Sequence, residues 1–153
     1  MSRQQIERAF PTLLYSRYRI TSPPEKDYNC IAWAAGDMSA WWEPDPQYIC
    51  YWPDDIPRVY TVEAYVGVFE TLGFTQCQEA GHEDGFEKVA IYISSDGKPA
   101  HAARQLGSGL WTSKLGNSED IEHGGWSALE GQIYGAATVI LKRRIHPYEE
   151  KQN

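Results

Sequence analysis

The sequence predicts an α+β domain in which early helices pack on a small antiparallel β-sheet. Helix-compatible segments lie in the first half of the chain, and strand-like segments follow one another after residue 73. One domain over residues 1–153 is the default expectation, because a chain of this length buries a core without disulfides or metal.

The helix expected over residues 30–35 matters most, because it begins with a cysteine. Asp27 or Asn29 can cap its start, and Gly36 can end it. The alanines within it are small enough to let another element approach closely. The pattern therefore predicts a short, central, buried helix.

Two other helices and one irregular segment complete the first half. Residues 3–9 are compatible with a helix. The clearest helix begins with Thr61 as its N-cap and ends at Gly73, because the apolar residues between them fall on one face. Residues 41–57 hold four prolines and three tryptophans, a proline density that no regular element tolerates. An ordered aromatic loop is predicted there.

Five strands are predicted in the second half, over residues 74–78, 88–94, 100–106, 110–116 and 134–143. The Gly-Ser-Gly turn at 107–109 joins two of them in a hairpin. If that hairpin pairs symmetrically about Ser108, Ala103 faces Ser113. Residues 117–131 are predicted to be a loop with one short helix.

Charge and hydropathy restrict the partners. The chain has 14 basic against 21 acidic residues, a net charge of −7, which disfavours contact with a phosphate backbone, so no nucleic-acid partner is predicted. No stretch approaches the roughly 18–20 apolar residues of a membrane span, so no membrane partner is predicted either. The first ten residues lack the apolar core of a signal peptide. We therefore expect a soluble, cytoplasmic protein.

The cysteines are odd in number. Cys30, Cys50 and Cys77 are widely spaced and form no C-x-x-C motif, which argues against a disulfide framework or a zinc knuckle. No metal site and no cofactor are predicted. In a reducing compartment, one of the three is free to be catalytic.

Cys30 and His101 are the candidate nucleophile and general base. Backbone N–H groups at a helix start favour a thiolate, and His101 heads a predicted strand. In the symmetric hairpin, Ser113 is the diagonal neighbour of His101, about 7–8 Å away between backbones, and can orient its imidazole. Asp120 is the alternative third residue. A buried packing role is the competing interpretation of Cys30.

Aromatic residues near the cysteine are candidate substrate contacts. Tyr28 lies two residues before Cys30 and can donate a hydrogen bond to an oxyanion. Trp33 is a further candidate contact, and Trp41, Trp42 and Trp52 of the aromatic loop can wall a substrate cleft after the cysteine.

A cysteine that opens a helix, a later strand headed by histidine and a next strand with a polar residue resemble the papain-like cysteine peptidase superfamily. The likeness is to NlpC-type amidases and endopeptidases first, and to transglutaminase-like domains next. It implies a papain-like fold with Cys30 as nucleophile and His101 as base. The chain departs from the transglutaminase-like pattern, which wants an Asp about four residues after Trp111, where Leu115 stands.

The stretches YNCIAWA and HAARQL…WTSKLG also resemble a set of uncharacterised bacterial proteins, over about residues 20–143. That likeness brings no established activity.

The sequence thus predicts a cysteine-dependent amide or acyl hydrolase, or an acyl transferase, of peptidase or amidase type, acting on a peptide or amide substrate. The alternative is a catalytically weak or inactive papain-like module that binds a peptide or protein partner, for example one associated with a toxin and its immunity protein.

Overall fold

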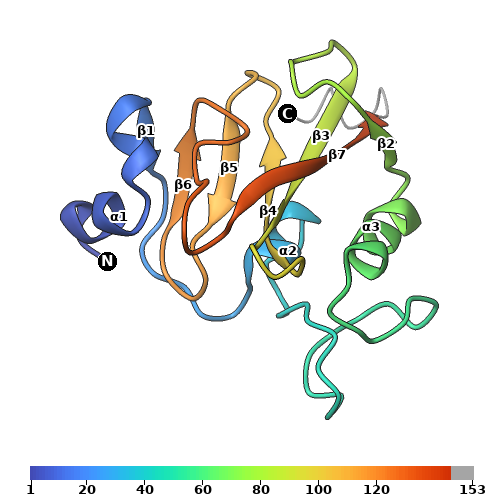
Figure 1. The fold of residues 1–153 in the computed structure, drawn as a ribbon. Helices are drawn as coiled ribbons and strands as arrows, with labels where there is room; N and C mark the ends of the chain where they lie inside the picture. Colours follow the sequence, from blue (N-terminus) through green and yellow to red (C-terminus); the bar gives the residue numbers. More distant parts are fainter. Residues whose placement is uncertain (146–153) are drawn as a thin grey trace.

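A computed structural model describes residues 1–145; the last residues of the expected domain, 146–153, lie outside the described part. The described residues form one seven-stranded antiparallel sheet with the order β1-β6-β5-β4-β3-β7-β2 (Figure 1). The strands are β1 (Tyr18–Ile20), β2 (Thr75–Cys77), β3 (Phe86–Ile93), β4 (Pro99–Gln105), β5 (Trp111–Lys114), β6 (Asp120–His123) and β7 (Ala136–Arg144).

The helices are short. They are α1 (Arg3–Ala9), the 3-10 helix η1 (Pro11–Tyr15), α2 (Cys30–Ala34) and α3 (Val62–Thr71). Side chains cap the α-helices as the sequence suggests: Asn29 accepts a hydrogen bond from the backbone at the start of α2, and Thr61 does so at the start of α3.

The predicted α+β, papain-like fold is wrong. The molecule is mainly an antiparallel sheet, and no long central helix carries the cysteine among the described residues. Two segments without a predicted strand, 18–20 and 120–123, pair with each other as β1 and β6 and extend the sheet. Helix α2 stops after five residues because Gly36, at φ +88°, turns the chain in a conformation that favours glycine.

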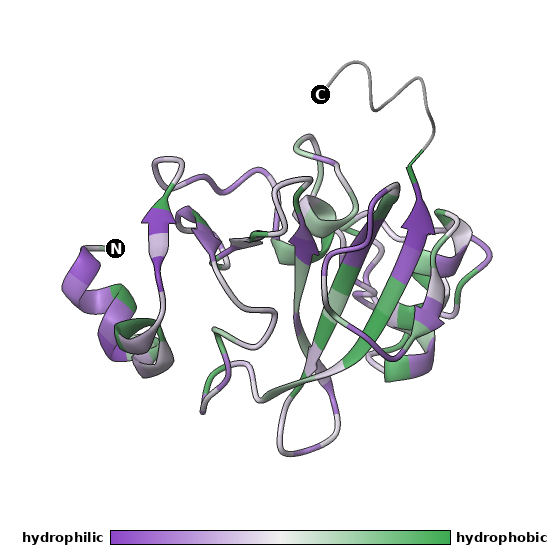
Figure 2. Cartoon of the chain, turned by 90° about the horizontal axis from the view of Figure 1, so that it is seen from above, coloured by the Kyte–Doolittle hydropathy of each residue, from purple (hydrophilic) through white to green (hydrophobic). Residues whose placement is uncertain are grey.

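The structure has two apolar clusters against the sheet, one with residues of α1 and the other with residues of α2 and α3. Figure 1 shows α1 beside the β1–β6 end of the sheet, and α3 at the opposite end, near β2. The α2–α3 cluster includes Tyr28, Ile31, Trp42, Tyr65, Phe69, Val89, Ile91, Ala102 and Leu141. The α1 cluster includes Ile6, Phe10, Leu13, Ala90, Tyr92, Ala103, Trp111, Ile121 and Leu129. Figure 2 shows apolar residues along the central strands, which are therefore buried on both faces.

Hairpin register determines which polar residues share a face. Arg104 faces Thr112 and Gln105 faces Trp111, so the predicted symmetry about Ser108 is confirmed. In the next pair of strands, His123 faces Trp111. Side chains alternate between faces along a strand, so the register places the side chains of β4, β5 and β6 in rows across the sheet.

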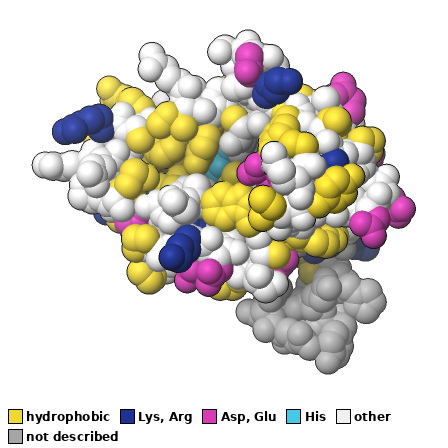
Figure 3. Space-filling model, turned by 90° about the horizontal axis from the view of Figure 1, so that it is seen from below, with side chains coloured by type: hydrophobic (Ala, Val, Ile, Leu, Met, Phe, Trp, Pro, Cys, Tyr) yellow, Lys and Arg dark blue, Asp and Glu magenta, His cyan; other side chains and the backbone are white. Residues whose placement is uncertain are grey.

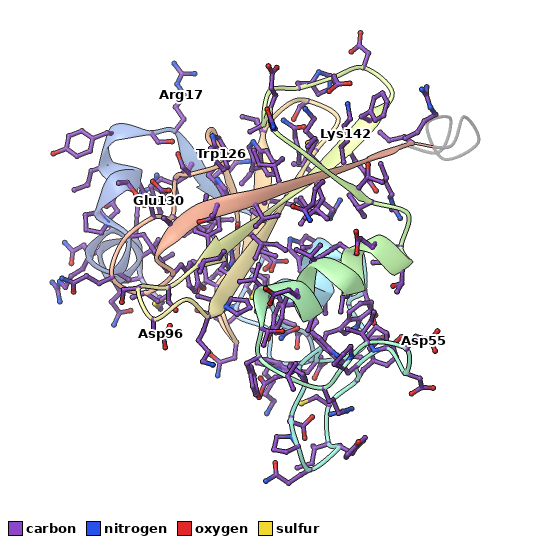
Figure 4. The ribbon with its side chains drawn as sticks, turned by 45° about the vertical axis from the view of Figure 1, so that its right-hand side comes forward. Arg17, Asp55, Asp96, Trp126, Glu130 and Lys142 are labelled. Carbon is purple, nitrogen blue, oxygen red and sulfur yellow. The ribbon has the colours of Figure 1, made fainter. Side chains whose placement is uncertain are left out.

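The aromatic loop predicted over 41–57 contains no helix and only an isolated bridge between Trp42 and Tyr51. Asp45 organises it: its carboxylate accepts hydrogen bonds from the N–H groups of Ile49 at 2.8 Å and Cys50 at 2.9 Å. Asp55 marks the outer side of this segment in Figure 4.

Candidate active site

Asn29 fixes the position of Cys30 at the start of α2. Its side-chain oxygen accepts hydrogen bonds from the N–H groups of Ala32 (3.1 Å) and Trp42 (3.0 Å). Its side-chain nitrogen donates to the Trp42 carbonyl at 2.7 Å. One buried side chain thus caps the helix and ties it to the aromatic loop, so Cys30 begins a rigidly anchored turn.

Burial determines the electrostatics of Cys30. The residue is half-buried at the edge of the α2–α3 cluster. Burial of its sulfur raises the pKa of the thiol to about 11, against the opposing effect of backbone N–H groups of Ala102, Ile31 and Cys30 and of the Lys114 charge. This shift runs opposite to the thiolate that the helix start was expected to favour. Cys30 is a neutral thiol that needs a base to become a nucleophile.

His101 lies in β4 and is fully buried. Its ring stacks on Tyr134 with centroids 4.1 Å apart and meets the edge of Tyr92 at 5.1 Å. Burial, followed by the charge of His123, lowers its pKa well below the usual value, so the imidazole is neutral. Its Nδ1 has no hydrogen-bond partner among the described residues. A buried, neutral imidazole with one open nitrogen is available as a base.

Ser113 and His123 complete a buried chain of hydrogen bonds from His101. The Ser113 hydroxyl lies 3.0 Å from His101 Nε2 and 2.8 Å from His123 Nε2. The other ring nitrogen of His123 lies 2.8 Å from the Gly125 carbonyl. The contact expected between His101 and Ser113 is present, and the structure adds a second histidine beyond it.

The role of His123 escaped sequence reasoning because its strand falls in a segment predicted to be a loop. A signal was present: Gly116-Asn117 follows a strand, and such a pair is typical of a hairpin turn. The DIEH stretch after it alternates, with Ile121 and His123 on one face. An antiparallel partner for β5 would have placed His123 beside Ser113.

Cys30 lies against the backbone of β4 next to the position of His101. The Cys30 sulfur lies by the N–H of Ala102, the residue that follows His101. The two side chains belong to different faces: Cys30 packs with the α2–α3 cluster, and the His101 ring contacts Tyr92 of the α1 cluster. The hydrogen bonds of the described residues include none between Cys30 and His101. Seen from below, hydrophobic side chains surround a hollow in which a small patch of histidine colour is visible (Figure 3).

Tyr28 is already hydrogen-bonded. Its hydroxyl donates to Asp120 Oδ2 at 2.8 Å, and its ring lies under the Lys114 ammonium at 5.1 Å. Burial raises the pKa of Tyr28 well above its usual value. Asp120 thus contacts Tyr28, and Ser113 contacts the imidazole of His101. Donation from Tyr28 to an oxyanion would require the bond to Asp120 to break.

The predicted tryptophans hold the aromatic loop and α2 in place, and the buried Trp52 donates its indole N–H to the Pro57 carbonyl at 3.0 Å. The indole N–H of Trp33 donates to Thr112 in β5 at 2.9 Å, and that of Trp42 donates to Asp37 at 2.8 Å. Trp41 is only half-buried and donates to Glu43 at 3.2 Å. Trp33 and Trp41 are both half-buried, so part of each side chain is free to contact a ligand.

Within residues 1–145, no three His, Cys, Asp or Glu side chains converge as metal ligands would. The same residues include no helix with the length and apolar character that a membrane crossing requires.

Comparison with known proteins gives a family without an activity. Searches of curated proteins and of solved structures found no match. A family model described as "Domain of unknown function (DUF7689)" matches residues 19–142, which include α2 and every strand that carries the candidate site. The chain therefore belongs to the DUF7689 family.

Proposed function

We propose that this protein is a cysteine-dependent acyl-transfer enzyme that cleaves or exchanges an amide or thioester bond. The observation that carries the proposal is the open Nδ1 of His101, one residue from the backbone N–H that meets the Cys30 sulfur. Buried polar atoms are nearly always paired, so an unpaired one calls for a functional explanation. The role of general base for the protonated Cys30 thiol gives His101 Nδ1 such an explanation.

The chemistry follows from the two neutral groups. This chemistry requires the Cys30 thiol, which packs with the α2–α3 cluster, to come within hydrogen-bond reach of His101 Nδ1. Nδ1 then takes the thiol proton as the sulfur attacks the carbonyl carbon, and the bond to the leaving amine or thiol breaks. The imidazolium returns that proton to the leaving group. Water or an acceptor amine then releases the acyl group from the Cys30 thioester. The Cys30 N–H at the start of α2 is the donor best placed for the oxyanion.

Reactivity of the three cysteines in one protein tests the proposal. We would measure iodoacetamide alkylation from pH 6 to 11 and map the sites by mass spectrometry, in wild type and in His101→Gln. Cys50 and Cys77 are free cysteines that serve as internal controls. His82→Gln, on an exposed turn, is the matched control.

The proposal expects Cys30 to react at neutral pH faster than a thiol of pKa about 11 can, with that excess lost in His101→Gln. A rate that climbs about tenfold per pH unit toward 11, unchanged in His101→Gln, would make Cys30 a packing residue. A shared thermal midpoint for the variants would show that unfolding does not cause the difference.

A second candidate is a binding module, and exposed apolar side chains in the aromatic loop favour it. Tyr48 is 76% and Ile49 is 82% exposed. Such residues are typical of protein-contact patches. Ile49→Ser separates the two functions: a binding module loses its peptide or protein partner, whereas an enzyme keeps the reactivity of Cys30.

A cytoplasmic location suits either function. The three cysteines are unpaired, and a reducing compartment keeps them so.

A further inference from the structure

We infer that His123 is a positioning residue: through Ser113, it fixes His101 in the tautomer whose Nδ1 is unprotonated and can act as a base. The inference deepens the proposed function and rests on it for its consequence. The arrangement of protons follows from the directions of the hydrogen bonds and from the neutrality of the two buried imidazoles, starting at the Gly125 carbonyl.

The first hydrogen bond ends at the Gly125 carbonyl, which can only accept a hydrogen bond. His123 Nδ1, 2.8 Å away, must therefore carry a proton. His123 is almost fully buried, and burial lowers its pKa to about 4, so the ring is neutral near pH 7. A neutral imidazole with a proton on Nδ1 has a lone pair on Nε2.

The next direction is set at Ser113. Because His123 Nε2 can only accept, the Ser113 hydroxyl, 2.8 Å away, donates its single proton to it. The hydroxyl oxygen then accepts from its other neighbour, His101 Nε2, at 3.0 Å. His101 Nε2 must carry the proton.

The proton on His101 Nε2 determines the state of its other ring nitrogen. A neutral ring with a proton on Nε2 has none on Nδ1, and this is the nitrogen without a partner among the described residues. The reverse tautomer would leave a buried N–H donor unpaired, which costs more than an unpaired lone pair. The three-residue relay of His101, Ser113 and His123 thus presents a base at the one open position.

Solution NMR tests this arrangement without any substrate. Long-range ¹H–¹⁵N spectra of the labelled protein at pH 7.5 distinguish protonated from unprotonated ring nitrogens, and through-bond correlations to the assigned backbone of ¹³C,¹⁵N-labelled wild type assign the signals. We expect a proton on Nε2 of His101 and on Nδ1 of His123 in the wild type. A wild-type spectrum with the proton on His101 Nδ1 would overturn the inference, even if every variant failed to fold.

Two substitutions at His123 give the matched comparison. His123→Phe removes the acceptor, so the Ser113 hydroxyl is free to donate to His101 Nε2. Each tautomer of His101 then leaves one buried donor unpaired, and the Nδ1-protonated form should become populated beside the Nε2-protonated one. His123→Gln keeps an acceptor oxygen near the position of Nε2 and should retain the wild-type tautomer. A folded His123→Phe with an unchanged His101 tautomer would show that His123 only fills space.

The alkylation rate of Cys30 at pH 7.5 measures how the tautomer of His101 affects the proposed chemistry. It should fall at least about tenfold in His123→Phe and stay within about threefold of wild type in His123→Gln, because a misplaced base loses most of its contribution. If the tautomers behave as expected while Cys30 is unreactive in every protein, the relay stands and the proposed enzyme function fails. If Cys30 is reactive but the tautomers are reversed, the opposite holds.

Discussion

Asp45 in the aromatic loop and His101 in β4 are both buried polar groups, but they are partnered in opposite ways. The Asp45 carboxylate accepts from two backbone N–H groups and from Arg58 Nη1 at 2.8 Å. His101 is bonded on one nitrogen and open on the other. The first arrangement holds an irregular segment without helix or strand. The second leaves one nitrogen of a base without a partner, in a strand whose position the sheet already fixes.

The hydrogen-bond networks of Asp45 and of His101 with His123 also differ in charge, so they affect stability in different pH ranges. The Ile49 N–H, with the other donors, lowers the pKa of Asp45 to about 2, so the group is ionised in the folded protein. Burial lowers the pKa of His123 to about 4, so that group is neutral. A fully hydrogen-bonded charge suits a structural role, and a buried base with an open position and a perturbed pKa is a candidate for chemistry.

The largest expected effect is loss of stability through the histidines. The pKa of His123 is about 6.5 unfolded and about 4 folded, so the unfolded state binds a proton first. Stability is complete above pH 6.5 and falls as the pH drops toward 4, by roughly 3 kcal/mol from His123 alone. His101 adds to the loss in the same direction.

Urea unfolding at pH 7.5, 6, 5 and 4.5 measures this loss. His123→Phe should flatten the dependence, whereas exposed His82→Gln should leave it as in wild type. A wild-type midpoint that stays constant from pH 7.5 to 4.5 would contradict a buried neutral His123.

A smaller loss is expected from Ser113→Ala. The change removes one buried oxygen and leaves the N–H of His101 and the lone pair of His123 without partners, at a cost of about 2 kcal/mol. The exposed Ser95→Ala is the control and should lie within about 0.5 kcal/mol of wild type. Chemical denaturation at pH 7.5 compares them, and equal stability of the two variants would mean that the relay contributes nothing to the fold.

Asp45 should affect stability in a lower pH window. Its folded pKa of about 2 lies below the unfolded value of 3.8, so its stabilisation is present above about pH 3.8 and is lost as the pH falls through 2. Asp45→Asn should lower the thermal midpoint at pH 5 and reduce its drop between pH 5 and 2.5. Asp55→Asn, on the exposed side of the loop, controls for net charge. A wild-type drop retained in full by Asp45→Asn would assign the acid sensitivity elsewhere.

Local signals in the sequence predicted most elements, and pairing at longer range explains what they missed. Caps at Asn29 and Thr61 and the hairpin about Ser108 were predicted because neighbouring residues determine them. Strand β1 has only three residues, and its pairing partner lies about a hundred residues away, so no local pattern reveals it. Without β1 and β6, the same helices appeared to dominate a smaller sheet.

The candidate site likewise has one part that the local sequence predicts and another that depends on pairing at longer range. His101 and Ser113 belong to one hairpin, and their contact followed from its register. His123 enters through a second hairpin, and the open nitrogen of His101 appears only once every neighbour is placed. The raised pKa of Cys30 likewise depends on burial by elements distant in sequence, which outweighs the helix start in a helix of only five residues.

The smallest effect tests whether the end of α2 matters to Cys30 at all. Gly36 has φ +88°, and no atom lies within 4 Å of the place that an added methyl group would take, so Gly36→Ala costs only backbone strain, about 1 kcal/mol. Cys30 is held from the other end, through the bonds of Asn29 to Ala32 and Trp42. Gly36→Ala should therefore lower the urea midpoint and leave the Cys30 alkylation rate within about twofold of wild type, since a cost confined to a turn does not spread through a rigid anchor. A large change in that rate would mean that the turn after α2, and with it the start of the aromatic loop, positions the cysteine.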